Sequence, residues 1–276
     1  MTDTAFNFTF SLNRTCAPQM SLPEFLRLAH GVGVDAIELR NDMGGELSDM
    51  PHDELRDLLD RAQTRVSSVN ALQRFNDMTP ARLAEARELA SLARAFGAVG
   101  VVLCPLIDPD IGWGDTERAT RLRDSLSALR PVFAGSGVMG LVEPLGMHGS
   151  TMKIQSEAVE AIEDIDGWDA FRLCHDTFQF YRCGDTRMFP EHFGMVHISG
   201  IARPDLSPAE LDEPDRGLVF AGDRAGNVAQ LNKIVAAGYR GPISMEPFDP
   251  EIQSDPALSA RLAASFDYIR ATVGTA

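Results

Sequence analysis

The sequence has few cysteines and no paired cysteine motif. Its four cysteines stand at positions 16, 104, 174 and 183 of a chain of 276 residues, and none forms a C-x-x-C pair. Scattered cysteines without a secretion signal are typical of reduced thiols, which are buried or incidental to function. We therefore expect no disulfide framework.

Targeting and membrane signals are also missing. The opening stretch MTDTAFNFTF has no positively charged region followed by a long apolar run, so it does not resemble a signal peptide. No apolar run approaches the roughly 18 residues that a membrane span requires. These absences predict a cytoplasmic protein with no membrane partner.

Positive charge is scarce. The chain carries 25 Lys and Arg against 40 Asp and Glu, a formal net charge of −15. A surface this negative repels phosphate backbones and anionic lipids, which argues against nucleic acid as a partner. With 44% hydrophobic residues, the composition is that of an ordinary globular protein, and a small molecule is the expected partner.

Strand-like and helical patterns alternate along the whole chain. This alternation predicts a parallel sheet. Eight strand–helix units with no long linker favour a single (β/α)₈ TIM barrel domain over residues 1–276, with a doubly wound open sheet as the alternative. The long polar loop 201–226 is expected to be functional. The predicted strands are 5–13, 36–40, 66–72, 100–105, 140–146, 171–179, 195–200 and 242–248, and the predicted helices are 21–32, 51–63, 79–96, 115–134, 153–165, 187–194, 227–237 and 255–273.

Two nearly identical phrases, VEPL at 142–145 and MEPF at 245–248, each put a glutamate at the end of a predicted strand. The two strands between them end in Asp176 and His197, so Glu143, Asp176, His197 and Glu246 mark four successive strand ends. Each alone could be a polar core residue with its own hydrogen bonds. Three carboxylates together in a barrel mouth repel one another unless a cation neutralises them. The pattern predicts a site for Mn²⁺, Mg²⁺, Co²⁺ or Zn²⁺.

Several stretches resemble the xylose-isomerase-like barrel superfamily of sugar isomerases and epimerases. They are FSLNRTCAPQMSLPEFLRLAHGVGVDAIELRND, VNALQRFND, VEPLGMHGST, LCHDTFQFYRCGD, VHISG and SMEPF, and the most similar branch is that of 2-keto-myo-inositol (inosose) isomerase. The resemblance implies that the four strand-end residues bind one divalent metal and that Glu143 and Glu246 are also the catalytic acid/base pair. One position departs from it: Gln179 stands where relatives often carry histidine, and glutamine cannot titrate.

Such a site suits proton transfer next to a carbonyl. A metal that chelates a ketone oxygen and the neighbouring hydroxyl acidifies the adjacent C–H, and a carboxylate can take that proton to leave an enediolate. Returning the proton to the other carbon isomerises the substrate, and returning it to the opposite face epimerises it. The loops after the last two strands are acidic and lack a glycine-rich turn, which favours a neutral polyol ketone over a sugar phosphate.

Further polar residues near the strand ends are candidates for substrate binding, and each could instead have a purely structural or solvent-exposed role. The amides could be structural, Arg40 could form a rim salt bridge, His148 could be a surface loop residue, and Arg216 could be solvated. His175 has the wrong strand parity and should point away from the metal. The candidates for substrate binding are Asn70, Gln73, Gln179, Arg40, His148 and Arg216.

Other functions within this superfamily remain open. Inosose isomerase is the first expectation and ketose 3-epimerase the alternative. An abasic-site endonuclease would need extra histidines on earlier strands and would have to overcome the negative charge. A sugar-binding barrel without turnover is disfavoured by the intact glutamate pair. The sequence leaves the oligomeric state open, a homodimer included.

Overall fold

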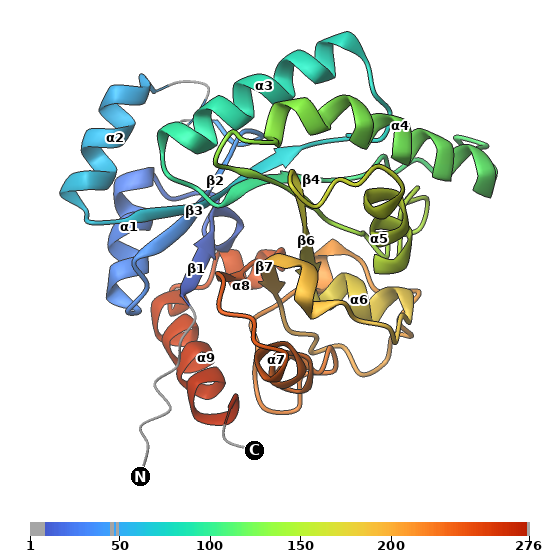
Figure 1. Ribbon diagram of the computed structural model, residues 1–276. Coiled ribbons are helices and arrows are strands. Elements are labelled where there is room, and N and C mark those ends of the chain that lie inside the picture. Colours follow the sequence, from blue (N-terminus) through green and yellow to red (C-terminus); the bar gives the residue numbers. More distant parts are fainter. Residues whose placement is uncertain (1–8, 45–46, 48–49, 275–276) are drawn as a thin grey trace.

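Strands and helices alternate along the chain, and the strands close into a barrel (Figure 1). The computed structural model describes residues 9–44, 47 and 50–274. The eight strands are parallel and pair in chain order, and β1 also pairs with β8. The predicted single-domain TIM barrel is confirmed, and the open-sheet alternative is wrong. The strands are β1 (Phe10–Asn13), β2 (Ala36–Arg40), β3 (Arg65–Leu72), β4 (Gly100–Leu103), β5 (Met139–Val142), β6 (Phe171–Asp176), β7 (Phe193–Ile198) and β8 (Ile243–Met245).

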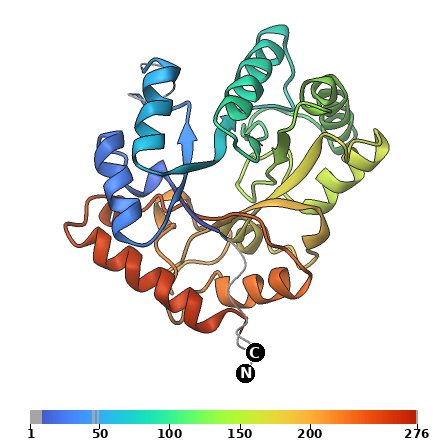
Figure 2. The same ribbon diagram turned by 60° about the vertical axis from the view of Figure 1, so that its left-hand side comes forward.

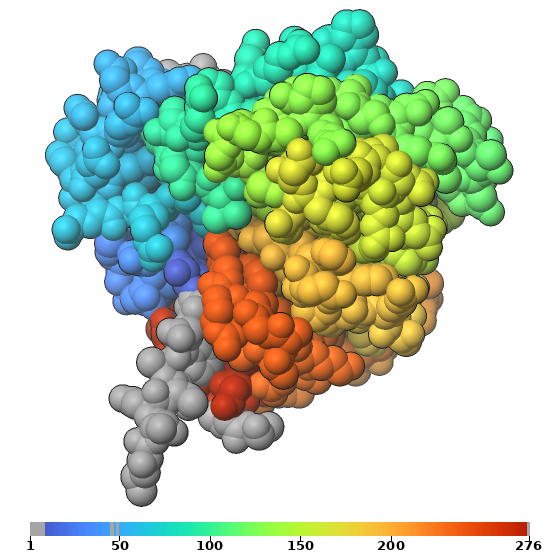
Figure 3. Space-filling model, in the orientation of Figure 1, coloured from blue at the N-terminus to red at the C-terminus, as the bar shows by residue number. Residues whose placement is uncertain are grey.

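The helices form a ring outside the barrel, as the turned view in Figure 2 shows. The first and last helices lie side by side and close this ring (Figures 1 and 2). On the face seen in the space-filling view, segments that follow one another in the chain lie next to each other (Figure 3). The helices are α1 (Leu22–Gly31), α2 (His52–Arg61), α3 (Pro80–Ala95), α4 (Asp115–Phe133), α5 (Gln155–Asp164), α6 (Thr177–Cys183), α7 (Asn227–Ala236), α8 (Pro250–Gln253) and α9 (Leu258–Thr272).

Most predicted elements lie within a few residues of the observed ones, because their helix start signals act locally. Ser21 begins α1 in a capping box with Glu24, and Thr79 caps α3 through a hydrogen bond to the N–H of Arg82. Residues 5–8 of the first predicted strand lie outside the described residues. Within the part of the chain that the structure describes, no helix is both long and apolar enough to span a membrane.

The prediction for residues 171–194 is wrong in two respects. The strand predicted at 171–179 ends at Asp176, and helix α6 starts at the next residue. The side chain of Asp176 caps this helix by accepting the N–H of Gln179, which outweighs the strand-like apolar alternation of Thr177–Phe180. The helix predicted at 187–194 is absent, and that segment holds only the one-turn 3₁₀ helix Pro190–His192.

The barrel interior has two chemically different halves. Below Asp176 and His197, the buried cluster contributed by β4 to β7 is apolar or sulfur-containing, and β1, β2, β3 and β8 contribute buried polar groups instead. Buried polar groups require partners, so this half is held by hydrogen bonds between side chains. The apolar half includes Val102, Cys104, Leu141, Cys174 and Met195, and the polar half includes Ser11, Asn13, Glu38, Ser68, Asn70 and Ser244.

Candidate metal centre

The four residues proposed as metal ligands meet at the carboxyl ends of β5 to β8. Asp176 ends β6 and pairs in register with His197 on β7, whereas Glu143 and Glu246 directly follow β5 and β8. One potential ligand atom from each lies within 4.8 Å of those of the other three, and all four side chains are buried. The arrangement has the size and donor types of a single-ion site, although ligation itself stays a prediction.

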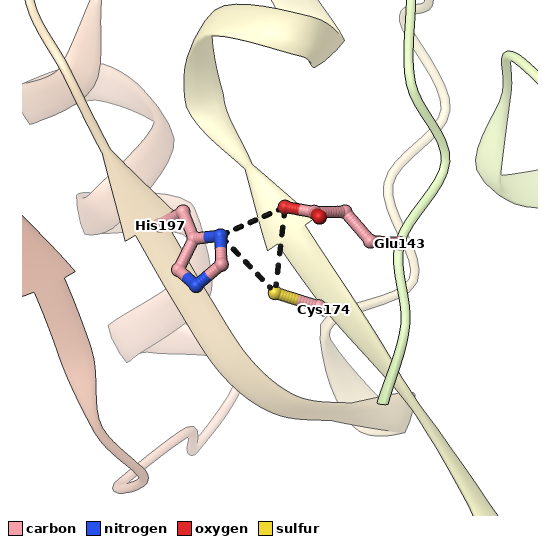
Figure 4. Close-up of side chains that lie close together, drawn as sticks. All are labelled: Glu143, Cys174 and His197. Atoms are coloured by element: carbon pink, nitrogen blue, oxygen red, sulfur yellow. Dashed lines mark hydrogen bonds and ion pairs between the residues drawn. The ribbon is translucent and has the colours of Figure 1, made fainter. Parts of the chain in front are cut away.

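One ring nitrogen of His197 faces the carboxylates. Nδ1 lies 2.7 Å from Oε1 of Glu143 and 3.3 Å from Oε2 of Glu246. Figure 4 shows this nitrogen directed at Glu143 and at the thiol of Cys174, whose Sγ is 3.6 Å away. Because Nδ1 faces the other candidate ligands, it is the nitrogen that would ligate an ion at this place.

Arg216 reaches into the same cluster from the long loop 201–226. Its Nη2 lies 2.5 Å from Oδ2 of Asp176 and 2.8 Å from Oε2 of Glu246. Arg216 is 3% exposed, and its guanidinium lies over the rings of Phe178 and Phe248, at 5.3 and 4.6 Å from their centroids. The solvated-charge alternative for Arg216 is therefore wrong.

The loop holds Arg216 in place through its backbone. Gly200, just after β7, exchanges two hydrogen bonds with Gly217, at 2.9 and 2.8 Å. The carbonyl of Arg216 also accepts the N–H groups of Phe248 and Asp249 after β8. A Cβ on Gly200 would lie 2.1 Å from the carbonyl oxygen of Leu218, so only glycine allows this close approach. The loop is thus part of the site.

Buried negative charge exceeds buried positive charge in this cluster. Four carboxylates are buried, those of Glu38, Glu143, Asp176 and Glu246, and two buried guanidinium groups face them, those of Arg40 and Arg216. With His197 neutral, these buried groups alone, four carboxylates against two guanidinium groups, carry an excess of two negative charges, which one divalent cation would balance. Burying unpaired charge is costly, so the donor set and its charge both fit a bound divalent metal.

The pKa directions reflect the same excess. Burial, together with the nearby carboxylates of Glu143 and Glu38, raises the pKa of Glu246 to about 7. Burial disfavours protonation of His197, yet the carboxylates of Glu246, Glu38 and Glu143 raise its pKa well above the usual range. Without a bound cation, the site therefore holds protons that a metal ion would displace.

Two residues of the site were missed by the sequence analysis. Glu38, on β2, is fully buried, and its Oε2 lies 3.1 Å from Nε2 of His197. Asn13, on β1, donates through Nδ2 to Glu38 at 3.1 Å and to Glu246 at 2.9 Å. The only sequence signal for Glu38 is an acidic residue within the apolar run AIELR, since carboxylates are rarely fully buried.

Burial opposes ionisation of Glu38, but the charge and hydrogen bond of His197 outweigh it. Together with the hydrogen bond from Ser68, they lower the pKa of Glu38 to about 2. Glu38 is therefore ionised throughout the neutral pH range.

Three of the proposed substrate-binding residues border the cluster. Asn70 donates to Oε1 of Glu246 at 3.3 Å, and Arg40 reaches the same oxygen at 3.3 Å while pairing with Asp42 at 2.6 Å. Gln179 is buried and donates through Nε2 to Glu213 at 2.9 Å. Its Oε1 is buried without a hydrogen-bond partner among the described residues, which leaves an acceptor available to a ligand.

The other histidine and glutamine candidates differ from these buried residues in exposure or direction. Gln73, in the turn after β3, and His148, after β5, are both exposed. His175 points away from the site, as its strand parity predicts, and lies between Gln155 at 2.6 Å and Gln230 at 2.9 Å. Burial lowers the pKa of His175 to about 4, so it is a neutral core residue.

Comparisons with known proteins agree with this architecture. The model of the family described as xylose isomerase-like TIM barrel matches residues 26–271. None of the curated proteins compared with the chain matches it.

Solved structures match over nearly the full length. A xylose isomerase domain-containing protein from Salmonella typhimurium LT2 is 26% identical, with 96% of this chain and 97% of that chain covered and a TM-score of 0.84. The IOLI protein, solved with a zinc atom bound, is 21% identical, with coverage of 97% and 100% and a TM-score of 0.85. A D-psicose 3-epimerase with D-tagatose from Clostridium cellulolyticum H10 is 15% identical, with coverage of 96% and 99% and a TM-score of 0.75.

Proposed function

The chain belongs to the xylose isomerase-like TIM barrel family, and from this premise we propose that it is a divalent-metal-dependent isomerase of a neutral polyol ketone. The observation that carries the proposal is the buried cluster of Glu143, Asp176, His197 and Glu246, with its excess of negative charge. The zinc bound by the similar IOLI protein is consistent with a metal here. The proposed substrate is an inosose, 2-keto-myo-inositol.

The chain's own residues supply the proton transfer. A divalent metal, when bound, polarises the ketone and neutralises the charge that develops on its oxygen. Glu143 and Glu246 approach Nδ1 of His197 from neighbouring directions, at 2.7 and 3.3 Å, so both border the same reaction space. One takes the proton from the hydroxyl-bearing carbon next to the carbonyl, the other returns a proton to the former carbonyl carbon, and the hydroxyl proton passes to the former carbonyl oxygen. This moves the carbonyl by one position.

The remaining polar groups hold the site's carboxylates in place or offer a partner to a substrate hydroxyl. Arg40 and Asn70 share Oε1 of Glu246 and hold its carboxylate in one orientation. Oε1 of Gln179 is a free buried acceptor and suits a substrate hydroxyl. Arg216 is already bonded to Asp176, Glu213 and Glu246, so it positions carboxylates rather than binding an anionic substrate. These groups support a neutral, hydroxyl-rich substrate.

Ketose 3-epimerisation is the alternative, since it shares the first proton transfer and differs only in the face to which the proton returns. A rigid carbocycle loses less entropy on binding than an open-chain ketose, which favours the inosose. We expect kcat/KM for 2-keto-myo-inositol to exceed that for fructose, tagatose or psicose by at least about tenfold, or 1.4 kcal/mol.

NMR in D₂O with these substrates identifies the carbon that exchanges its proton and the product that forms. Faster epimerisation of a ketohexose would overturn the inosose assignment and leave the proton-transfer chemistry in place. Metal binding with no proton exchange from any ketone would instead favour a binding protein without turnover.

Replacing Gln179 by alanine should weaken substrate binding without stopping proton transfer. Loss of one neutral hydrogen bond costs about 0.5–1.5 kcal/mol, so KM should rise about two- to twelvefold, with a smaller change in kcat. The control is Asn232→Ala on α7, where the side-chain oxygen of Asn232 accepts the N–H of Gly274. A variant in which kcat falls more than KM rises, with one limb of the pH profile lost, would assign Gln179 a different role.

A further inference from the structure

We propose that Glu38 is a positioning residue, which fixes Nε2 of His197 as a hydrogen-bond donor and thereby presents Nδ1 to the metal ion. This inference rests on the metal-dependent function proposed above. It adds a residue of β2 to the four candidate ligands, which come from the ends of β5 to β8.

The two ring nitrogens of His197 face chemically distinct partners. Nδ1 faces Glu143 and Glu246, the candidate ligands, and Nε2 lies 3.1 Å from Oε2 of Glu38 on the opposite edge of the ring (Figure 4 shows the two nitrogens). His197 and Glu38 are both fully buried, so water cannot replace this contact. With a metal ion bound, Glu143 and Glu246 are engaged by the ion, and Glu38 is the carboxylate acceptor that keeps the ring proton on Nε2 and leaves the lone pair of Nδ1 to the metal.

Glu38 is itself held in place, as a positioning residue must be. The hydroxyl of Ser68 donates to Oε2 at 2.5 Å, and Nδ2 of Asn13 donates to Oε1 at 3.1 Å. Both oxygens of Glu38 are therefore already hydrogen-bond acceptors. The carboxylate cannot turn toward the ion without losing these buried hydrogen bonds, which excludes it as a fifth ligand in this arrangement.

Asn13 also holds the proposed acid/base residue Glu246 in position. Its Nδ2 donates both to Oε1 of Glu38 and to Oε1 of Glu246, at 3.1 and 2.9 Å. The side-chain amide of Asn13 thus links Glu38, which contacts Nε2 of His197, to Glu246, which lies near Nδ1. Asn13 and Glu38 are register partners on β1 and β2, so the barrel backbone sets this spacing.

The test compares Zn²⁺ binding by wild type, Glu38→Gln and Glu38→Met, measured by competition with a chromophoric chelator. Loss of such a partner typically weakens metal affinity 10- to 100-fold. We expect a Kd increase of about tenfold for glutamine, which keeps an acceptor, and of up to about a hundredfold for methionine, which has none. If the methionine variant does not fold, the glutamine variant carries the test.

A second readout separates orientation from charge. In ¹⁵N-histidine-labelled, Zn²⁺-loaded wild type, the His197 ring should carry its proton on Nε2 and the metal on Nδ1. In the Glu38 variants, the NMR signals of this ring should report a mixture of the two tautomers. Asp42→Asn is the charge-matched control, because Asp42 pairs with Arg40 and is not a partner of His197. Its Kd for Zn²⁺ should change less than that of Glu38→Gln.

The outcomes are distinct. Wild type that binds no divalent metal would overturn the proposed function. Wild type that binds Zn²⁺ while both Glu38 variants bind it equally well, or lose affinity only as much as Asp42→Asn with an unchanged histidine pattern, would overturn the role of Glu38 alone.

Discussion

Dialysis against a chelator is expected to abolish turnover and to lower the melting temperature, and Mn²⁺, Co²⁺, Zn²⁺ or Mg²⁺ should restore both. The physical reason is the buried excess of carboxylate charge from Glu38, Glu143, Asp176 and Glu246 over the charge of Arg40 and Arg216. A ligand present at a hundred times its Kd stabilises the folded state by about 2.7 kcal/mol. For a chain of this size that corresponds to a shift of about 5–10 °C.

Elemental analysis of the purified protein identifies the metal, and calorimetry before and after chelation measures the shift. Adding each ion back separately ranks the ions by the turnover and the melting temperature that they restore. The donor set alone does not give this ranking. Glu251→Gln, an exposed carboxylate on α8, is the matched control and should show the same shift as wild type. Metal-free protein that retains full activity would refute a metal-dependent mechanism.

Glu246→Gln is expected to lower kcat at least about a hundredfold while the protein still binds metal, though more weakly. General acid–base catalysis contributes about 10²- to 10⁴-fold, and an amide can ligate but cannot exchange a proton. Solvent-proton exchange into the substrate, followed by NMR in D₂O, should fall by the same factor as turnover. Equal losses in exchange and turnover would place Glu246 in the proton-transfer step itself.

The substitution also has a structural consequence that the experiment must separate. Oε1 of Glu246 accepts hydrogen bonds from Asn13, Arg40 and Asn70, and Oε2 accepts one from Arg216. An amide NH₂ placed on either side would meet a donor, so some loss of stability is expected. Glu246→Asp keeps the charge and withdraws the carboxylate by one methylene, and its kcat should lie between those of wild type and Glu246→Gln. Turnover of folded Glu246→Gln within a few-fold of wild type would remove Glu246 from the mechanism.

The sequence alone was sufficient for the barrel and for the grouping of the four strand-end residues. Both depend on local patterns: apolar runs that alternate with amphipathic stretches, and acidic or histidine side chains at strand ends that a parallel barrel must gather on one rim. Glu143, Asp176, His197 and Glu246 follow from this rule without knowledge of any contact. The same local signals failed at Thr177–Cys183, where an apolar alternation typical of a strand forms a helix because Asp176 caps it.

Only the tertiary structure decided which polar residues join these four. Glu38 lies on β2 and His197 on β7, far apart in the chain, and they meet because the pairing of β1 with β8 closes the sheet and points both side chains inward. Arg216 stands in a polar loop whose composition is equally typical of solvated charge, and it is buried because Gly200 and Gly217 pair and fold that loop over the rim. Gln73 and His148 stand near strand ends in the sequence, yet both are exposed. Periodicity reports which face of an element is buried, whereas the partner of a buried polar group depends on how distant strands and loops close in space.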